Sequence, residues 1–203
     1  MTTRARVTGV VLAAGQGRRM GMPKALVDAG DGSTWLARTV REIAAAGCTD
    51  LLVVVGAEER RVRASYEGPP VSFVLAQDWA SGMGASLRVG LEALAAEAGE
   101  RADAALIMLV DLPDVGAPVV RRVLDHADGA GAAQDVLARA TYDGRPGHPV
   151  LVGRGHWAAM AATLSGDEGG RRYLDAHGAT AIECGDLAAG RDQDTPPGTS
   201  GPA

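Results

Sequence analysis

Three glycines and two basic residues follow an apolar run near the start of the chain. The glycines are Gly15, Gly17 and Gly21, and the basic residues are Arg19 and Lys24. Glycines leave backbone amide groups free to point at an anion, and the two side chains add positive charge. This combination suits a triphosphate, whose charge must be neutralised before a nucleophile approaches. The spacing G-x-G-x-x-x-G matches neither standard phosphate fingerprint, and a glycine-rich turn with solvated arginines explains the spacing about equally well.

Asp111 is a candidate metal ligand near this loop. It follows the apolar stretch "ALIMLV" and precedes Leu112 and Pro113. Because the carboxyl ends of parallel strands meet at one edge of a sheet, its carboxylate is expected beside the glycine loop. Mg²⁺ takes one or two carboxylates together with phosphate oxygens and waters, so this aspartate and one further acid are sufficient. An aspartate that caps a turn before proline is the structural alternative.

Alternating strand-like and helix-like segments would position these residues. The continuous apolar run 7–14 is typical of a strand covered on both faces. Further strands are predicted in 50–56, 71–75, 105–110 and 135–140, and helices in 35–46, about 86–94 and 118–125, with short helices near Trp157 and Tyr173. Right-handed crossovers turn this order into an α/β three-layer sandwich around a mostly parallel sheet. Ligands of such folds bind outside the carboxyl ends of the strands, where the glycine loop is expected.

Composition narrows the class of protein further. The 203 residues are 46% hydrophobic, which indicates a single domain, and we place it at 1–191. Residues 192–203 then form a closing acidic motif and a tail rich in Pro, Gly and Ser, which we expect to be disordered. The formal charge of −5 and the lack of a basic run with aromatic residues exclude an extended nucleic-acid surface. No apolar stretch approaches the ~20 residues that span a bilayer, and no signal peptide is recognised. Cys48 and Cys184 are unclustered, which favours a cytoplasmic protein.

The stretch "LAAGQGRRMGMPKAL" resembles the signature of the MobA-like nucleotidyltransferases, in particular their molybdenum cofactor cytidylyltransferase (MocA-like) branch. The segments "WASGMGASLRVGL", "LVDLP", "RPGHPVLVGR", "GDEGGRRYL" and "DQDTP" follow in the family's order and cover nearly the whole chain. The resemblance implies a Rossmann-like nucleotidyltransferase (GT-A-like) fold. It also implies magnesium-dependent transfer of a nucleotidyl group from a nucleoside triphosphate to a phosphate of the acceptor, with release of pyrophosphate.

The same resemblance assigns roles in nucleotide binding. Base and ribose would be lined by the strand end, the β- and γ-phosphates would be held by the glycine loop, and Lys24 would stabilise charge at the reacting α-phosphate. In this family Ala-Ala-Gly at the strand end is associated with cytidine nucleotides and Ala-Gly-Gly with guanine nucleotides, so Ala14 favours CTP. A turn that precedes a predicted helix start at Ser86 would also face the nucleotide, although an ordinary capped helix explains it too. The residues of this predicted nucleotide site are Leu12, Ala13, Ala14, Gly15, Gly17, Arg19, Lys24, Gly82 and Ser86.

The later motifs predict the acceptor site and the second metal ligand. "DQDTP" resembles the family's closing motif, and Asp194 is preferred over Asp192 as the partner of Asp111 because it abuts Thr195. The resemblance places the acceptor between "GHP" and "GDEGGRR", with His148 presented by a loop and with Arg171 or Arg172 bonded to an acceptor phosphate.

The chain departs from the family pattern at two places. Ala76 stands where relatives commonly carry Asn, so Gln77 or Asp78 would have to replace that contact with the nucleotide, and the chain ends soon after "DQDTP".

Three functions remain open from the sequence. The leading hypothesis is transfer of CMP from CTP to a molybdopterin-type cofactor, with Lys24, Arg19 and Asp111 as catalytic residues and a molybdenum hydroxylase as a client enzyme. The first alternative is the same fold acting on another phosphorylated acceptor, such as a sugar phosphate. The second is a nucleotide-binding accessory protein that assists cofactor insertion.

Overall fold

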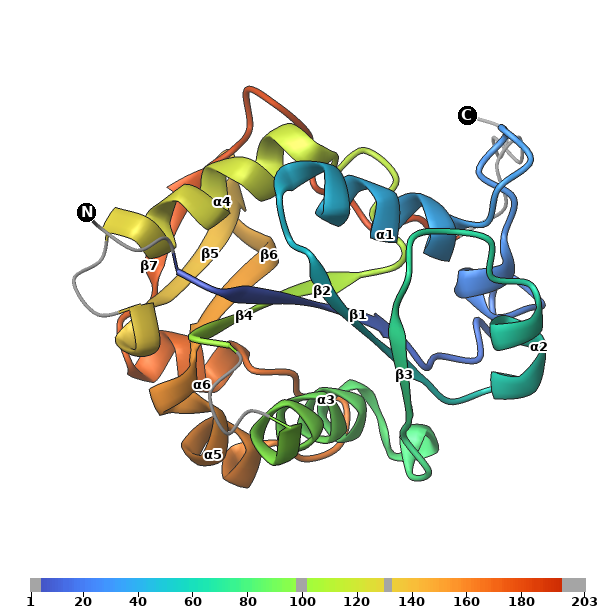
Figure 1. Ribbon diagram of the computed structural model, residues 1–203, viewed down its shortest axis with the longest axis horizontal. Helices are drawn as coiled ribbons and strands as arrows, with labels where there is room; N and C mark the ends of the chain where they lie inside the picture. Colours follow the sequence, from blue (N-terminus) through green and yellow to red (C-terminus); the bar gives the residue numbers. More distant parts are fainter. Residues whose placement is uncertain (1–4, 98–101, 130–132, 195–203) are drawn as a thin grey trace.

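The computed structural model describes residues 5–97, 102–129 and 133–194, which form one seven-stranded sheet with helices on both faces (Figure 1). The spatial order of the strands is β3-β2-β1-β4-β6-β5-β7. Their bounds are Val7–Ala13 (β1), Asp50–Val55 (β2), Ser72–Leu75 (β3), Ala104–Leu109 (β4), Leu137–Tyr142 (β5), Arg145–Gly153 (β6) and Thr180–Glu183 (β7). Strand β6 pairs antiparallel with both of its neighbours and the other pairs are parallel, so the predicted α/β class with a mostly parallel sheet is confirmed.

Two helical layers cover the sheet. One face carries α1 (Trp35–Ala46) and α4 (Ala117–Gly129), and the other carries α3 (Met83–Glu97), α5 (Arg154–Thr163) and α6 (Arg171–Ala176) (Figure 1). The short helix α2 (Glu59–Ala64) lies near the β3 edge, and three 3₁₀ turns complete the fold at Lys24–Leu26, Trp79–Ser81 and Ala133–Asp135. None of the helices in these ranges is long and apolar enough to cross a membrane.

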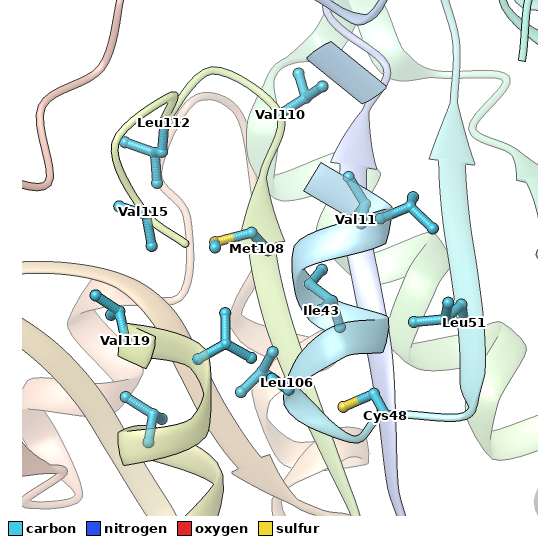
Figure 2. Close-up of a cluster of buried hydrophobic side chains, with 14 of the residues drawn as sticks. Val11, Ile43, Cys48, Leu51, Leu106, Met108, Val110, Leu112, Val115 and Val119 are labelled. Atoms are coloured by element: carbon cyan, nitrogen blue, oxygen red, sulfur yellow. The ribbon is translucent and has the colours of Figure 1, made fainter. Parts of the chain in front are cut away.

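Each face of the sheet has its own hydrophobic core, because successive side chains of a strand point to opposite faces. In β1, Val11 packs with Ile43 of α1 and Met108 of β4, as Figure 2 shows. Val10 and Leu12 instead join the cluster under α3 and α5. Both faces of the central strands are therefore buried, which explains their continuous apolar sequences.

Local signals fix the boundaries of α1. The Thr34 hydroxyl accepts a hydrogen bond from the Ala37 amide at 3.2 Å, and Gly47 ends the helix with φ of 115°. The helix thus covers the predicted range 35–46, between a side-chain cap and a left-handed glycine.

Several elements differ from the sequence-based expectation. Helix α3 begins at Met83, so Ser86 lies within its first turn and not at its start. Strands β6 and β7 and helix α2 were not anticipated, and β6 includes the segment "GHP" that was expected to be a loop. Residues 192–194 are ordered against the rest of the protein, whereas the remainder of the expected tail lies outside the described residues.

Candidate functional site

The glycine loop and Asp111 meet because their strands are neighbours in the sheet. In the parallel pair of β1 and β4, Leu12 is opposite Leu109, so the chain leaves both strands at the same edge. The loop that follows β1 is tightly folded: Gly17 has φ of 63°, and a Cβ at this position would lie 1.9 Å from the Met22 carbonyl oxygen. This close approach requires glycine and returns the chain so that Lys24 faces Asp111.

Lys24 joins two acidic residues at this edge. Its Nζ lies 2.6 Å from Asp111 Oδ2 and 2.7 Å from Asp194 Oδ1. Asp194 is also hydrogen-bonded to Arg19. The Gln193 amide donates to the Asp111 carbonyl oxygen at 2.9 Å, which fixes the closing segment on the strand end. Asp194, the preferred acid of the closing motif, therefore shares Lys24 with Asp111, whereas Asp192 is exposed.

Electrostatics keep Lys24 charged. Partial burial alone would lower the pKa of its amine, but the hydrogen bonds and negative charges of Asp111 and Asp194 outweigh burial and raise this pKa. In return the hydrogen bond from Lys24 lowers the pKa of Asp194, against a smaller opposing effect of desolvation. The group is thus a cation held between two carboxylates.

One oxygen of Asp111 is free to bind a cation. Asp111 Oδ1 is buried and has no hydrogen-bond partner among the described residues, while Oδ2 binds Lys24. A buried carboxylate oxygen without a partner is energetically unfavourable, and a divalent ion would satisfy it. No cluster of three or more His, Cys, Asp or Glu side chains suitable for a metal occurs in the described ranges, so the protein could supply the two carboxylates and leave other positions to phosphate oxygens and water.

A cavity of about 370 Å³ lies against this edge of the sheet. Apolar residues at the ends of β1 and β4, the glycine loop and the start of α3 form its wall. Of the predicted nucleotide site it contains every residue except Arg19, which is exposed and lies outside the lining. The residues of the predicted nucleotide site in the lining are Leu12, Ala13, Ala14, Gly15, Gly17, Lys24, Gly82 and Ser86. The predicted metal ligand Asp111 also lines the cavity.

Sequence reasoning missed several residues of this wall. Arg18, and not Arg19, lines the cavity, and Trp79 and Asp167 are also part of the lining. Ala76 is fully buried and outside the lining, and Asp78 is paired with Arg88. Gln77 and Asp78 do not line the cavity either.

A second cavity of about 220 Å³ adjoins the first, and Leu12 and Met83 line both. His148 and Arg171, two of the predicted acceptor residues, lie in its wall. Arg172 does not, because it is exposed and its Nη2 lies 2.7 Å from Oε1 of Glu168, in the segment that precedes α6.

His148 differs from the expected loop position. It lies on β6, half-buried, with its ring in the second cavity. Desolvation lowers the pKa of this imidazole to about 4, and the nearby negative charge of Asp111 offsets only part of that effect. His148 is therefore neutral at pH 7. It can exchange hydrogen bonds with a ligand but contributes no positive charge.

The chain is similar to known proteins over most of its length. The model of the MobA-like NTP transferase domain matches residues 9–181. Among curated proteins, the nicotine blue oxidoreductase of Paenarthrobacter nicotinovorans is 34% identical over 200 residues, which cover 93% of this chain and 92% of that protein.

Solved structures agree in fold. The homologue of Mycobacterium tuberculosis Rv0371c from Mycobacterium sp. strain JC1 has a TM-score of 0.75 and 32% identity, covering 95% of this chain and 92% of that one. Rv0371c of M. tuberculosis H37Rv, crystallised in complex with manganese, has a TM-score of 0.66 and 28% identity, covering 88% of this chain and 87% of that one.

Proposed function

The chain belongs to the MobA-like NTP transferase domain family and is a nucleotidyltransferase, and we propose that it transfers CMP from CTP to the phosphate of a molybdopterin-type cofactor. The observation that carries this proposal is the Lys24 ammonium between Asp111 and Asp194, beside a cavity formed by the glycine loop. The site thus combines a fixed cation, a free carboxylate oxygen and a glycine-rich loop. Such groups act on the charge of a phosphoryl transition state.

In the proposed reaction an oxygen of the acceptor phosphate attacks the α-phosphorus of CTP. The bond from this phosphorus to the bridging oxygen of the β-phosphate breaks, and pyrophosphate leaves with the electron pair. The ammonium of Lys24 stabilises the negative charge that grows on the α-phosphate oxygens. Arg18 and the amides of the glycine loop hold the leaving pyrophosphate, and Arg19 keeps Asp194 in place.

A divalent cation fits the acidic pair. Asp111 and Asp194 would hold it, and bound Mg²⁺ would supply further neutralisation of the triphosphate. Manganese in the crystals of Rv0371c supports a divalent metal of this kind. The buried, unpartnered Oδ1 of Asp111 is the feature of this protein that favours it.

CTP is preferred in this proposal because Ala14, and not glycine, lies in the wall of the larger cavity. Its side chain is almost fully buried at the end of β1, and its carbonyl oxygen accepts from the Ala57 amide at 3.0 Å. The methyl group narrows the space beside the base and favours a pyrimidine. The acceptor then occupies the second cavity, with His148 and Arg171 in its wall. We place the reaction in the cytoplasm, with a molybdenum hydroxylase as the client of the product.

The test is release of pyrophosphate by the purified protein with Mg²⁺ and each of CTP and GTP, in the presence and absence of molybdopterin. We expect release with CTP that depends on the acceptor. Release with a sugar phosphate but not with molybdopterin would support the same chemistry on another acceptor. Binding of CTP without release would support an accessory role.

A second candidate follows from the curated relative, which is named nicotine blue oxidoreductase. The two adjoining cavities could hold a nicotinamide nucleotide and a planar aromatic acceptor of its hydride. Loss of NADH or NADPH absorbance with nicotine blue as acceptor, without CTP, would favour this function. An unchanged absorbance together with release of pyrophosphate would exclude it.

A further inference from the structure

Arg139 lies in the wall of the second cavity, although no sequence motif singled it out. It is on β5, opposite Val150 of β6. Its neighbours Ala138 and Ala140 point into the core under α4, so Arg139 points to the other face, where α3, α5 and α6 pack. An arginine that is largely buried between the sheet and its helices is unusual and needs a partner of matching chemistry.

Part of its guanidinium is already bonded. Arg139 Nη2 lies 2.7 Å from Asp175 Oδ1 on α6, and the side chain is only 16% exposed. The buried Nε, by contrast, has no hydrogen-bond partner among the described residues. Arg171 Nε lies 3.8 Å from the other oxygen of Asp175, so two cations share one carboxylate and the charge here remains positive.

The rest of the wall offers mostly apolar surface. Leu87, Ile107, Met160 and Leu174 line the cavity, and His148 is neutral at pH 7. A volume of about 220 Å³ is below the roughly 300–1,000 Å³ typical of sites that enclose a whole drug-sized ligand. The cavity therefore suits the ring portion of a molecule whose other end lies outside it.

We propose that Arg139 is a specificity residue whose Nε donates a hydrogen bond to a ring carbonyl of the acceptor, at the end remote from the reacting phosphate. The proposal rests on the function proposed above. In the strand order β1-β4-β6-β5, Arg139 is three strands from the glycine loop. At about 4.8 Å between strands this is about 14 Å across the sheet, so a phosphate reacting near Lys24 is out of reach of Arg139.

A ring carbonyl of the acceptor, remote from the reacting phosphate, would explain the unbonded Nε of Arg139. A flat ring system can pack between the apolar side chains and present one carbonyl oxygen to Nε, which would satisfy a donor that is otherwise buried without a partner. A ring that carries an amino group at this position would place two donors together and would be rejected. A site built to bond one polar group discriminates strongly against an analogue that lacks it.

Two fluorescent probes test this inference directly. 6-Hydroxymethylpterin carries a ring carbonyl at position 4, and 2,4-diamino-6-hydroxymethylpteridine carries an amino group there. We expect the wild-type protein to bind the first at least about tenfold more tightly than the second, and Arg139→Met to reduce this ratio to about threefold or less. Arg139→Lys keeps the charge but changes the geometry of the donor, so it should restore the preference only in part.

Asp175→Asn is the matched control, because it removes the ion pair and leaves the Nε of Arg139 in place. This variant should keep the preference for the carbonyl probe. Binding of CTP, followed by the fluorescence of Trp79 in the other cavity, should be the same in wild type and Arg139→Met, as should their thermal melting within a few degrees.

Three results would overturn the inference: a wild-type protein that binds neither probe, equal binding of both probes by the wild type, or a preference unchanged in Arg139→Met. Failure of the proposed function is seen separately, in the release of pyrophosphate. Discrimination that depends on Arg139 in a protein that releases no pyrophosphate supports the inference and contradicts the transferase proposal. Release of pyrophosphate, together with a probe ratio that is the same in Arg139→Met and wild type, would support the transferase proposal and contradict the inference.

Discussion

Lys24 Nζ lies 2.6 Å from Asp111 Oδ2, although the two residues are 87 positions apart in the chain. One comes from the 3₁₀ turn after the glycine loop and the other from the end of β4. Their pairing leaves the second oxygen of Asp111 buried and unbonded. The same contact therefore orients a cation and leaves a ligand position for a metal ion, and the two roles can be separated by substitution.

Substitution of Lys24 should impair turnover more than binding. In Lys24→Ala we expect kcat to fall by about 10²–10³-fold, because the ammonium acts on charge that develops in the transition state. The Kd for CTP should change only a few-fold. Arg19→Ala is the comparison, since Arg19 is 77% exposed and outside the cavity, and its loss should be much smaller. Similar kcat values for Lys24→Ala and wild type would contradict the assigned role.

Asp111→Asn should weaken metal dependence and activity together, because an amide is a poorer ligand than a carboxylate for a hard cation. The measurement is activity as a function of Mg²⁺ and of Mn²⁺ concentration, and the half-maximal concentration should rise about tenfold or more. Asp192→Asn provides the control, since Asp192 is exposed. Identical titrations for Asp111→Asn and wild type would remove Asp111 from the metal site.

Ala14→Gly should increase kcat/KM with GTP relative to CTP. Removal of the buried methyl group widens the space beside the base, and pocket contacts of this type change discrimination by about 1–3 kcal/mol, or roughly tenfold or more. Both nucleotides are to be measured on both proteins at one Mg²⁺ concentration with saturating acceptor. A wild-type preference for GTP would contradict the assignment to cytidine but not the nucleotidyltransferase family.

Two glycines of the loop separate steric from conformational effects. Gly17 and Gly21 both have positive φ, 63° and 73°, but only at Gly17 would a Cβ meet backbone, 1.9 Å from the Met22 oxygen. Gly17→Ala should therefore reduce CTP affinity by about tenfold or more, while Gly21→Ala pays only the cost of its backbone conformation, about 1 kcal/mol. Calorimetric titration with CTP measures both. Equal losses would show that the shape of the loop does not depend on the contact at Gly17.

Acid should remove the contribution of Glu183 to stability. Backbone amides of Gly185, Gly144 and Asp143 and the Thr141 hydroxyl donate to this carboxylate and lower its pKa to about 2. A carboxyl group with a lowered folded-state pKa stabilises the protein above its unfolded pKa, about 4.3, and loses this effect as the pH falls toward the folded value. Urea unfolding of wild type and Glu183→Gln should thus differ at pH 7 and converge between about pH 4 and 2. A constant difference over this range would contradict the prediction.

The sequence alone determined the α/β class and the central elements. Continuous apolar runs predicted β1 and β4, and a helix was predicted at 35–46, where α1 lies, because such signals are local. About half of the residues that line the larger cavity had also been predicted, mainly because they lie close together in β1 and the loop that follows it.

Only the tertiary structure decided how distant segments meet. "GHP" has the glycine and proline of a loop, yet it lies within β6, because the residues on both sides of it pair with β5 and this pairing outweighs local preference. Arg18 and not Arg19 lines the cavity, a choice fixed by the fold of the loop. Arg139 carries no motif and looks like an ordinary strand residue. Its buried, unbonded Nε arises from the packing of β5 against α6, which no local pattern encodes.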